Sequence, residues 1–491
     1  MTVVKKRIAQ VLGLLLVLYL VLLIPDFENK APFVKAGAKP FTWNKDQLWR
    51  KLENDFIKAR QSQRHQLDSA IDVLKLTANN QLALLQTKQL PATDSNFIII
   101  QNNFFALAPL IAVSPGQLTW YSNYYNQLRN AIKLQSQHWN MSQPLARNCV
   151  YSLLYGMRAA VEEVLLQNNA TTFPPAMLVN NEKSVTPSTK IFGIEVHSGD
   201  LLVSRGGAEV SALISRGNDY PGNFSHIALL YVDANTNQPY LIESHIEKGV
   251  AVSSVAGYEK DKKLRFMVMR PRADLPVMLA DPMLPQTAAK KMYEESFARH
   301  IPYDFKMNYV DSSAMFCSEV ASYAYRKNGL QIWSSLSTIS SQGVVNWLND
   351  FGVENFVTQM PSDLEYDPQL SIVAEWRDPG TLFKDHLDNA VMDAMLEQAN
   401  EGKKIKYNLW KLPLARLIKG YCMLRNAFGG VGLIPEGMSA TKALKNETFV
   451  AMNKKIKDQT QQLSDDFIKQ QHYRPPYWQL VRFAETAAAQ K

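Results

Sequence analysis

The chain has 491 residues, which is enough for two or three domains with cores of their own. Its 53 basic and 45 acidic residues give a net charge of +8. Residues 401–491 contain 16 basic and 7 acidic side chains, a balance of +9, so the remainder of the chain is nearly neutral. The positive charge therefore describes one C-terminal surface, and we expect no nucleic-acid partner.

The sequence contains three cysteines, Cys149, Cys317 and Cys422, which are too few for a disulfide framework. It contains no zinc-type Cys/His spacing, P-loop or dinucleotide-binding motif. We therefore predict no metal and no cofactor. Cys149 and Cys422 are expected to be free thiols in the core.

The N-terminus has the pattern of a signal anchor. Three basic residues at positions 5–7 precede an apolar run over residues 8–24, in which Gln10 is the only strongly polar member. The run is short for a membrane-spanning helix and long for a signal-peptide core, and no small-x-small cleavage site follows it. We predict an uncleaved transmembrane helix in residues 1–30 of a single-pass inner-membrane protein, with the bulk of the chain in the periplasm. A cleaved signal peptide is the alternative.

Residues 31–190 are predicted to form a helical domain and a linker. Residues 44–90 contain no Gly or Pro and repeat apolar residues at helical intervals, which predicts one long helix or two in sequence. Further helices are expected at 116–137 and 144–167. Paired prolines at 174–175 mark the linker into the next domain.

Two strands are predicted at 224–232 and 240–245, separated by a turn. Because side chains alternate along a strand, Glu243 and His245 share one face. If the strands form a hairpin, His226 and Glu243 can meet across it.

The segment 309–330 is predicted to carry a helix that begins near Phe316 and ends at Gly329. Cys317 then lies in the first turn, where the helix dipole and free N–H groups favour a thiolate. Such a cysteine is either a nucleophile or a small core residue. A His and a Glu on neighbouring strands favour the nucleophile, because they can serve as its base and as the group that orients the base.

Five short segments occur in a fixed order along the chain. They are GDLLVSR (199–205), FSHIALL (224–230), LIES (241–244), IPYDF (301–305) and FCSEV (316–320). The order resembles the circularly permuted papain-like amidases of the YaeF/YiiX type in the NlpC superfamily, in which the cysteine helix follows the histidine strands. The resemblance covers about residues 193–335 and implies Cys317 as nucleophile, His226 as base and Glu243 as the third polar member.

Three further residues are assigned to support or substrate binding. The resemblance implies that Tyr303 lines the site near the oxyanion, although a packing role is an equal alternative, and Asp304 approaches the nucleophile loop. His245 is a second candidate for the third member, since histidine fills that place in the related lecithin:retinol acyltransferase group. That group has Asn-Cys-Glu-His at the nucleophile, whereas this chain has Phe-Cys-Ser-Glu, so we favour Glu243.

Residues 341–491 are predicted to be a mainly helical, basic C-terminal region, with helices at 381–402 and 442–471. The segment 406–425 interleaves apolar and basic residues. A helix of this kind either lies on an anionic membrane surface or covers the core with its basic face in water. We favour the core interpretation.

The sequence thus predicts an α+β chain. In it, residues 191–340 form a permuted papain-like domain with a small antiparallel sheet packed on the Cys317 helix, between two helical regions and behind one membrane helix. The predicted function is a cysteine amidase or hydrolase that forms an acyl-enzyme on Cys317. Peptidoglycan-type peptides are the favoured substrate because export is expected. A lipid acyltransferase or thioesterase, or a non-catalytic binding scaffold, are the alternatives, and no oligomeric state is indicated.

Overall fold

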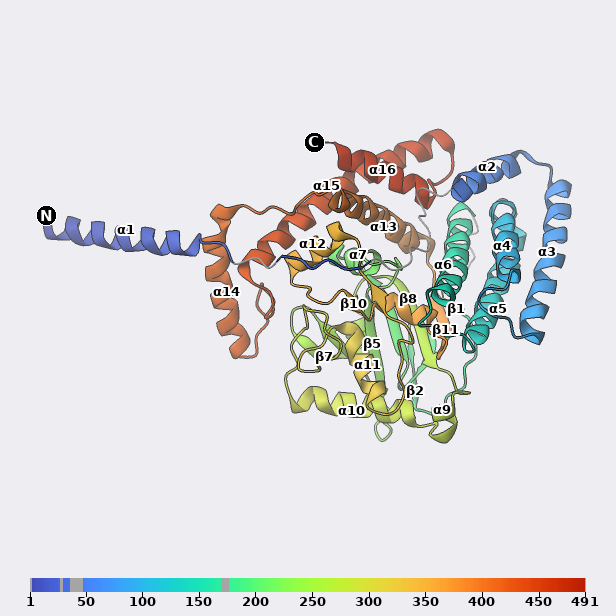
Figure 1. The fold of residues 1–491 in the computed structure, drawn as a ribbon, viewed down its shortest axis with the longest axis horizontal. Coiled ribbons are helices and arrows are strands. Elements are labelled where there is room, and N and C mark those ends of the chain that lie inside the picture. Colours follow the sequence, from blue (N-terminus) through green and yellow to red (C-terminus); the bar gives the residue numbers. More distant parts are fainter. Residues whose placement is uncertain (1, 27–29, 36–46, 169–175, 491) are drawn as a thin grey trace.

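The computed structural model describes residues 2–26, 30–35, 47–168 and 176–490. An antiparallel sheet lies at the centre of the molecule, the N-terminal helices stand on one side of it, and the C-terminal helices cover one end (Figure 1). The chain is therefore an α+β protein with helical regions on both sides of its sheet, as predicted.

The central sheet has seven strands in the order β1-β11-β8-β4-β5-β6-β7, all paired antiparallel. The strands are β1 (Ala176–Leu178), β4 (Leu201–Gly206), β5 (His226–Val232), β6 (Pro239–His245), β7 (Gly249–Ser254), β8 (Lys263–Pro271) and β11 (Leu370–Trp376). The predicted hairpin is β5 and β6, in which Ala228 is paired with Glu243. The sheet extends beyond residues 191–340 at both ends of that range, because it includes β1 and β11.

Alternation along the strands supplies two cores, one on each face of the sheet. On β5, Ile227 and Leu229 enter one core, while Ala228 and Leu230 enter the other. The first face is covered by α10 (Leu284–Ala298) and α11 (Cys317–Arg326). The predicted packing of the cysteine helix on the sheet is therefore observed.

The N-terminal region consists of five helices packed side by side (Figure 1). They are α2 (Gln47–Gln61), α3 (Arg64–Thr87), α4 (Asn96–Ala112), α5 (Leu118–Ser136) and α6 (Pro144–Gln167). Of the two interpretations of residues 44–90, two helices in sequence is correct, although residues 44–46 lie outside the described residues. Tyr121, Tyr124 and Tyr125 on α5 are buried, so they pack in this core.

The C-terminal helices pack on each other and on the end of the sheet. They are α12 (Gln342–Phe351), α13 (Pro379–Asn400), α14 (Leu412–Ala427), α15 (Ala440–Gln471) and α16 (Tyr477–Ala489). The shorter elements are β2 (Ser188–Ile191), β3 (Ile194–His197), α7 (Glu209–Arg216), α8 (Val255–Lys260), α9 (Pro276–Ala280), β9 (Ser337–Thr338), β10 (Val357–Thr358), and the 3₁₀ helices η1 (Pro115–Gln117), η2 (Pro361–Tyr366) and η3 (Leu409–Lys411). The helices predicted at 381–402 and 442–471 correspond to α13 and α15. Cys149 and Cys422 are free thiols, of which Cys422 is buried and Cys149 half-buried.

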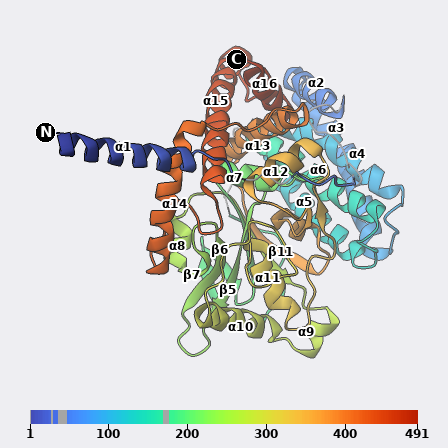
Figure 2. The same cartoon turned by 60° about the vertical axis from the view of Figure 1, so that its left-hand side comes forward.

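The N-terminal helix α1 (Thr2–Leu22) projects from the body, and its C-terminal end meets α14 (Figure 2). Within the described ranges, no helix combines the length and apolar character needed to cross a membrane. The transmembrane helix predicted in residues 1–30 is therefore not found. The apolar part of α1, Ile8–Leu22, is about 22 Å long at 1.5 Å per residue. A bilayer's hydrocarbon core is about 30 Å thick.

The helix α14 also differs from its prediction. Leu412, Ala415 and Cys422 are buried, but most of the large apolar residues of this segment point to solvent. The expectation that the segment covers the core with only its basic face in water is therefore wrong.

Buried ion pairs connect the helical regions to the sheet. Arg265 on β8 bonds to Glu162 on α6, with 2.8 Å between Nη2 and Oε2, and also to Asp385 on α13. A second pair joins Arg129 of α5 to Glu375 of β11 at 2.8 Å. All of these side chains are almost fully buried, so each charge depends on its partner.

We predict that Arg265→Met destabilises the protein by about 3–5 kcal/mol, because it leaves two buried carboxylates without their common partner. Chemical unfolding followed by circular dichroism measures this change. The matched control is Lys51→Met, which removes an exposed ion pair with Asp55 and should cost less than about 1 kcal/mol. Equal effects of the two substitutions would contradict the structural role of Arg265.

Candidate active site

Cys317 is the first residue of α11, and its position follows from how that helix begins. Phe316, the residue before it, has an extended backbone, and its N–H donates to Glu319 Oε2 at 2.7 Å. The backbone therefore turns sharply into the helix at Cys317, which places this residue in the first turn, where N–H groups lack intrahelical partners.

Glu319 is buried two residues after Cys317. Burial raises its pKa to about 9 against the effect of the Phe316 hydrogen bond, and the charge of Asp304 and of Cys317 acts in the same direction as burial. The carboxyl is therefore neutral at pH 7. It satisfies the helix start without placing a negative charge next to the thiol.

The loop that leads to Cys317 is held by the strands next to His226. The Ser244 hydroxyl on β6 donates to the carbonyl of Met315 at 2.6 Å, and the Met315 N–H donates to Pro302 O at 3.0 Å. On β7, the Val250 N–H donates to Ile301 O at 2.9 Å. The strands β6 and β7 therefore fix the position of Cys317 relative to the β5–β6 hairpin.

His226 is the first residue of β5, and its Nε2 lies 2.8 Å from Oε2 of Glu243 on β6. Glu243 is opposite Ala228, so the two side chains are diagonal neighbours in the hairpin. The predicted contact across the hairpin is therefore observed. Because Nε2 faces the carboxylate, Nδ1 is the ring nitrogen left to interact with Cys317, which raises the pKa of His226.

The electrostatics of this group favour a protonated imidazole. Burial by itself would lower the pKa of His226, but its interactions with Cys317 and with Glu243 raise that pKa to about 10. For Glu243, burial acts to raise the pKa, but the hydrogen bond from His226 and electrostatic interactions with His226 and the nearby His245 hold it well below its usual range. The imidazole of His226 is therefore protonated at pH 7.

The sulfur of Cys317 is enclosed, with only 4% of the residue exposed. Its Sγ is 3.7 Å from the carbonyl oxygen of Ser225, a long and weak contact for a thiol donor. The side chain of His226 is 24% exposed, so the imidazole is the more accessible member of the pair.

His245 lies on the other side of Glu243. Its Nε2 is 3.7 Å from Glu243 Oε1, which is beyond hydrogen-bonding distance. Its ring stacks near that of His226, with 5.6 Å between the ring centres. The structure thus brings both candidates for the third position close to His226, and only Glu243 hydrogen-bonds to it.

Tyr303 and Asp304 lie in the loop between α10 and α11. Burial, and then the charge at Cys317 and at Asp304, raise the pKa of Tyr303 well above its usual value, so its hydroxyl remains a donor. Asp304 accepts from the N–H groups of Lys306 at 2.8 Å and Asn308 at 2.5 Å. Asp304 therefore shapes the loop, while the pKa of Tyr303 responds to the charge at Cys317.

The sequence prediction missed the roles of Ser244 and of the Ser225 carbonyl. Ser244 belongs to the LIES segment, so its motif was visible, but the contact it makes is with Met315, 71 residues away along the chain. The Ser225 contact is made by a backbone carbonyl and therefore carries no residue-type signal.

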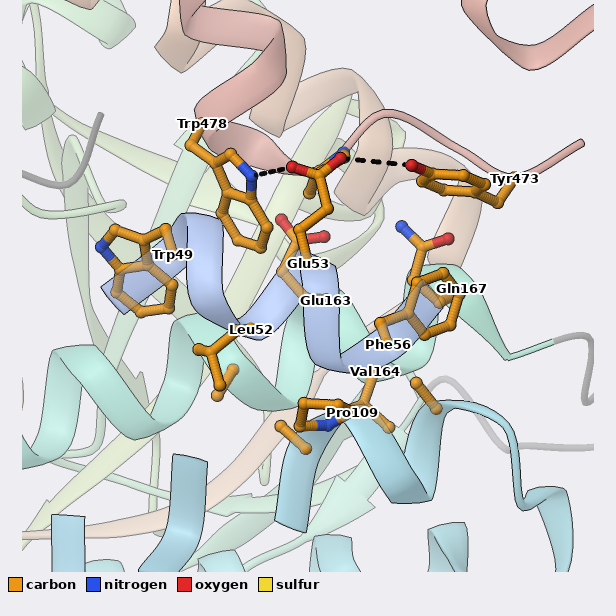
Figure 3. Close-up of a pocket in the computed structure, with 14 residues that line it drawn as sticks. Trp49, Leu52, Glu53, Phe56, Pro109, Glu163, Val164, Gln167, Tyr473 and Trp478 are labelled. Carbon is orange, nitrogen blue, oxygen red and sulfur yellow. Dashed lines mark hydrogen bonds between the residues drawn. The ribbon is translucent and has the colours of Figure 1, made fainter. Parts of the chain in front are cut away.

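A separate apolar pocket lies between α2, α4, α6 and the segment before α16 (Figure 3). Its cavity volume is about 50 Å³, whereas sites for small molecules measure about 300–1,000 Å³. Glu53 in its wall accepts from Trp478 Nε1 at 2.8 Å and from the Tyr473 hydroxyl at 3.2 Å. This pocket is therefore a packing feature of the helical regions. Over the described part of the chain, no group of three or more His, Cys, Asp or Glu residues is arranged to hold a metal ion.

We predict that Glu243→Gln lowers the pKa of His226 from about 10 by about 1–3 units, because the substitution removes an adjacent negative charge. Histidine NMR over a pH series measures the change. His245→Gln is the control and should leave the titration of His226 nearly unchanged. A larger effect of His245→Gln would contradict the assignment of Glu243 as the hydrogen-bonding partner.

Comparison with known proteins adds two matches of different kinds. Residues 195–374 match a family described as permuted papain-like amidase enzyme, YaeF/YiiX, C92 family. Among solved structures, the crystal structure of the metalloprotein yiiX from Escherichia coli O157:H7 is 18% identical, and the alignment covers 37% of this chain and 98% of that chain with a TM-score of 0.29. A search of curated proteins finds no match.

Proposed function

We propose that the permuted papain-like amidase domain of the YaeF/YiiX type, which residues 195–374 form, makes this chain a cysteine hydrolase that cleaves an amide or related acyl bond. The observation that carries the proposal is the position of His226. Its imidazole is hydrogen-bonded to the buried Glu243 carboxylate, and interactions with Cys317 and with Glu243 raise its pKa. A nucleophile, a base and a group that orients the base are the parts that acyl transfer requires.

In the first step, Cys317 attacks the carbonyl carbon of the substrate as a thiolate, because its proton has already passed to His226, whose raised pKa keeps the imidazole protonated. The tetrahedral intermediate then collapses, and His226 donates that proton to the leaving amine or alcohol as the bond to it breaks. In the second step, water attacks the thioester, His226 takes a proton from the water, and the proton returns to the sulfur as the acid is released.

We assign two donors to the negative oxygen of the tetrahedral intermediate. One is the N–H of Cys317 at the start of α11, where the helix dipole adds a favourable field. The other is the hydroxyl of Tyr303, which remains protonated because its pKa is raised. Glu319, being neutral, does not oppose this charge.

Glu243 serves as the third member by holding the ring of His226 with Nδ1 toward the sulfur and by stabilising the imidazolium. Peptidoglycan-type peptide bonds and lipid acyl bonds both suit this chemistry. Localisation on the exported side of a membrane stays a proposal, motivated by the basic and then apolar N-terminus. A binding scaffold would have no need of a base with a raised pKa beside a cysteine.

The proposal predicts that p-nitrophenyl acetate acetylates Cys317, seen as a burst of p-nitrophenol and as one acetyl group by mass spectrometry. Cys317→Ala should abolish both signals. His226→Ala should slow the burst at pH 7 by about 10²–10⁴-fold, with partial recovery as pH rises and thiolate forms unaided. Glu243→Gln should cost less than His226→Ala.

The matched control is Cys149→Ala, which removes a thiol whose pKa burial raises to about 12 and should leave acetylation unchanged. A full burst in Cys317→Ala, or acetyl groups at Cys149 or Cys422 in the wild type, would refute the proposed nucleophile.

The rate of amide hydrolysis should fall as pH rises through about 10, the pKa of His226. Above that pH the imidazole is neutral and has no proton to give to the leaving amine. An activated ester is the control, because p-nitrophenolate leaves without a proton and its release should fall less. Parallel declines for the two substrates, with the fold intact by circular dichroism, would show that His226 is not the acid.

A further inference from the structure

The helix α14 presents an apolar stripe to solvent. Six large residues on one side of it are 60–88% exposed, and they recur at intervals of four and three along the chain. They are Trp410, Leu414, Leu417, Tyr421, Leu424 and Phe428, and together we call them the α14 stripe. The opposite side of the helix buries Leu412, Ala415 and Cys422. One face of α14 therefore packs on protein, and the face that carries the stripe is exposed to solvent.

The stripe continues into the segments at both of its ends. Beyond Phe428, a glycine-rich turn carries Val431 and Leu433, which are also exposed. At the other end, the Tyr19 hydroxyl on α1 donates to the carbonyl of Trp410 at 3.5 Å. Arg416 holds the two helices together, since it donates to Leu22 O at 3.0 Å and pairs with Asp26 at 2.6 Å. The apolar surface therefore runs from α14 into α1.

The composition of α1 identifies the kind of partner. Its large apolar residues are exposed at consecutive positions from Leu14 to Val21, which cover every side of a helix. A protein surface covers one side of a helix, whereas acyl chains can surround it. A helix that is apolar all round is typical of a protein interior or of a membrane.

The basic residues around the stripe indicate that the lipids are anionic. Lys404 and Lys406 are exposed just before η3, and Arg425 is exposed beside the stripe. At the far end of the apolar surface, Lys6 and Arg7 are exposed at the start of α1. Cations beside an apolar helix face, with Trp and Tyr among the apolar residues, are the pattern of helices that lie in the interface of anionic bilayers.

We propose that the α14 stripe, together with α1, docks this protein on the surface of an anionic lipid bilayer. The stripe enters the boundary between headgroups and acyl chains, and the cations bind lipid phosphates. This surface is independent of the chemistry at Cys317.

The docking surface is also connected to the loop that carries Tyr303. Phe305 packs against Cys422, Ile434 and Met438 of α14 and the turn that follows it. His300 Nε2 lies 3.0 Å from Glu436 Oε2 in the same turn. A bilayer bound at the stripe would therefore lie on the side of the molecule next to the active-site loop.

The test measures sedimentation of the full chain with vesicles of phosphatidylcholine containing about one-third phosphatidylglycerol. We expect binding that weakens as salt is raised, and that weakens with pure phosphatidylcholine. The triple variant Leu414→Gln, Leu417→Gln, Leu424→Gln should bind at least about tenfold more weakly, because each substitution removes apolar surface that the bilayer would bury. Lys404→Gln with Lys406→Gln should reduce the salt dependence.

The matched control replaces equally exposed apolar residues of the N-terminal helices, Val73→Gln, Leu76→Gln and Ile98→Gln, which are 63–66% exposed. This variant should bind vesicles like the wild type, and so should Cys317→Ala. Undiminished binding by the α14 variant, or no binding by the wild type at low salt, would overturn the proposal. A dimer in sedimentation equilibrium that the α14 variant abolishes, without vesicle binding, would assign the stripe to a second copy of the chain instead.

Discussion

The arrangement of the whole molecule depends on the burial of Arg265 between two carboxylates from different parts of the chain. Arg265 is on β8, near the middle of the sheet, Glu162 comes from the N-terminal helices and Asp385 from the C-terminal ones. A buried ion pair adds little stability over apolar packing, but a buried charge without its partner is very costly. The network therefore discriminates strongly against other ways of placing the helices on the sheet. It holds β8 in place, and β8 pairs with β4, which in turn pairs with β5, the strand that carries His226.

Within the candidate site, two carboxyl groups differ in charge because their surroundings differ. Glu243 is held as a carboxylate by His226, whereas Glu319, two residues after Cys317, is neutral because burial outweighs the opposing effects of the Phe316 hydrogen bond and of Arg326. Two acids near one cysteine thus have opposite effects. The first favours a protonated imidazole, and the second closes the helix start without opposing a negative sulfur.

Much of the site was predictable, because its geometry follows from local rules. Strand alternation and a short turn indicate that His226 and Glu243 meet, and a helix start at Phe316 places Cys317 in the first turn. The buried network was not predictable, since an arginine on a strand gives no local sign of partners such as Glu162, 103 residues away. The orientation of α14 was predicted wrongly. Its amphipathic pattern shows that two faces differ, but periodicity alone does not say which face meets protein.

The late position of Asp385 in the chain has a consequence for how the protein is made. When the ribosome has completed Cys317, all three residues of the candidate triad exist, but β11 and α13 have not been synthesised. Arg265 and Arg205 would then have to enter the core without the carboxylate that both contact. The buried ion-pair network on the sheet is therefore completed only when the last quarter of the chain is being made. Until then, Arg265 has Glu162 alone as its partner, so the C-terminal helices add the second half of its charge compensation late in synthesis.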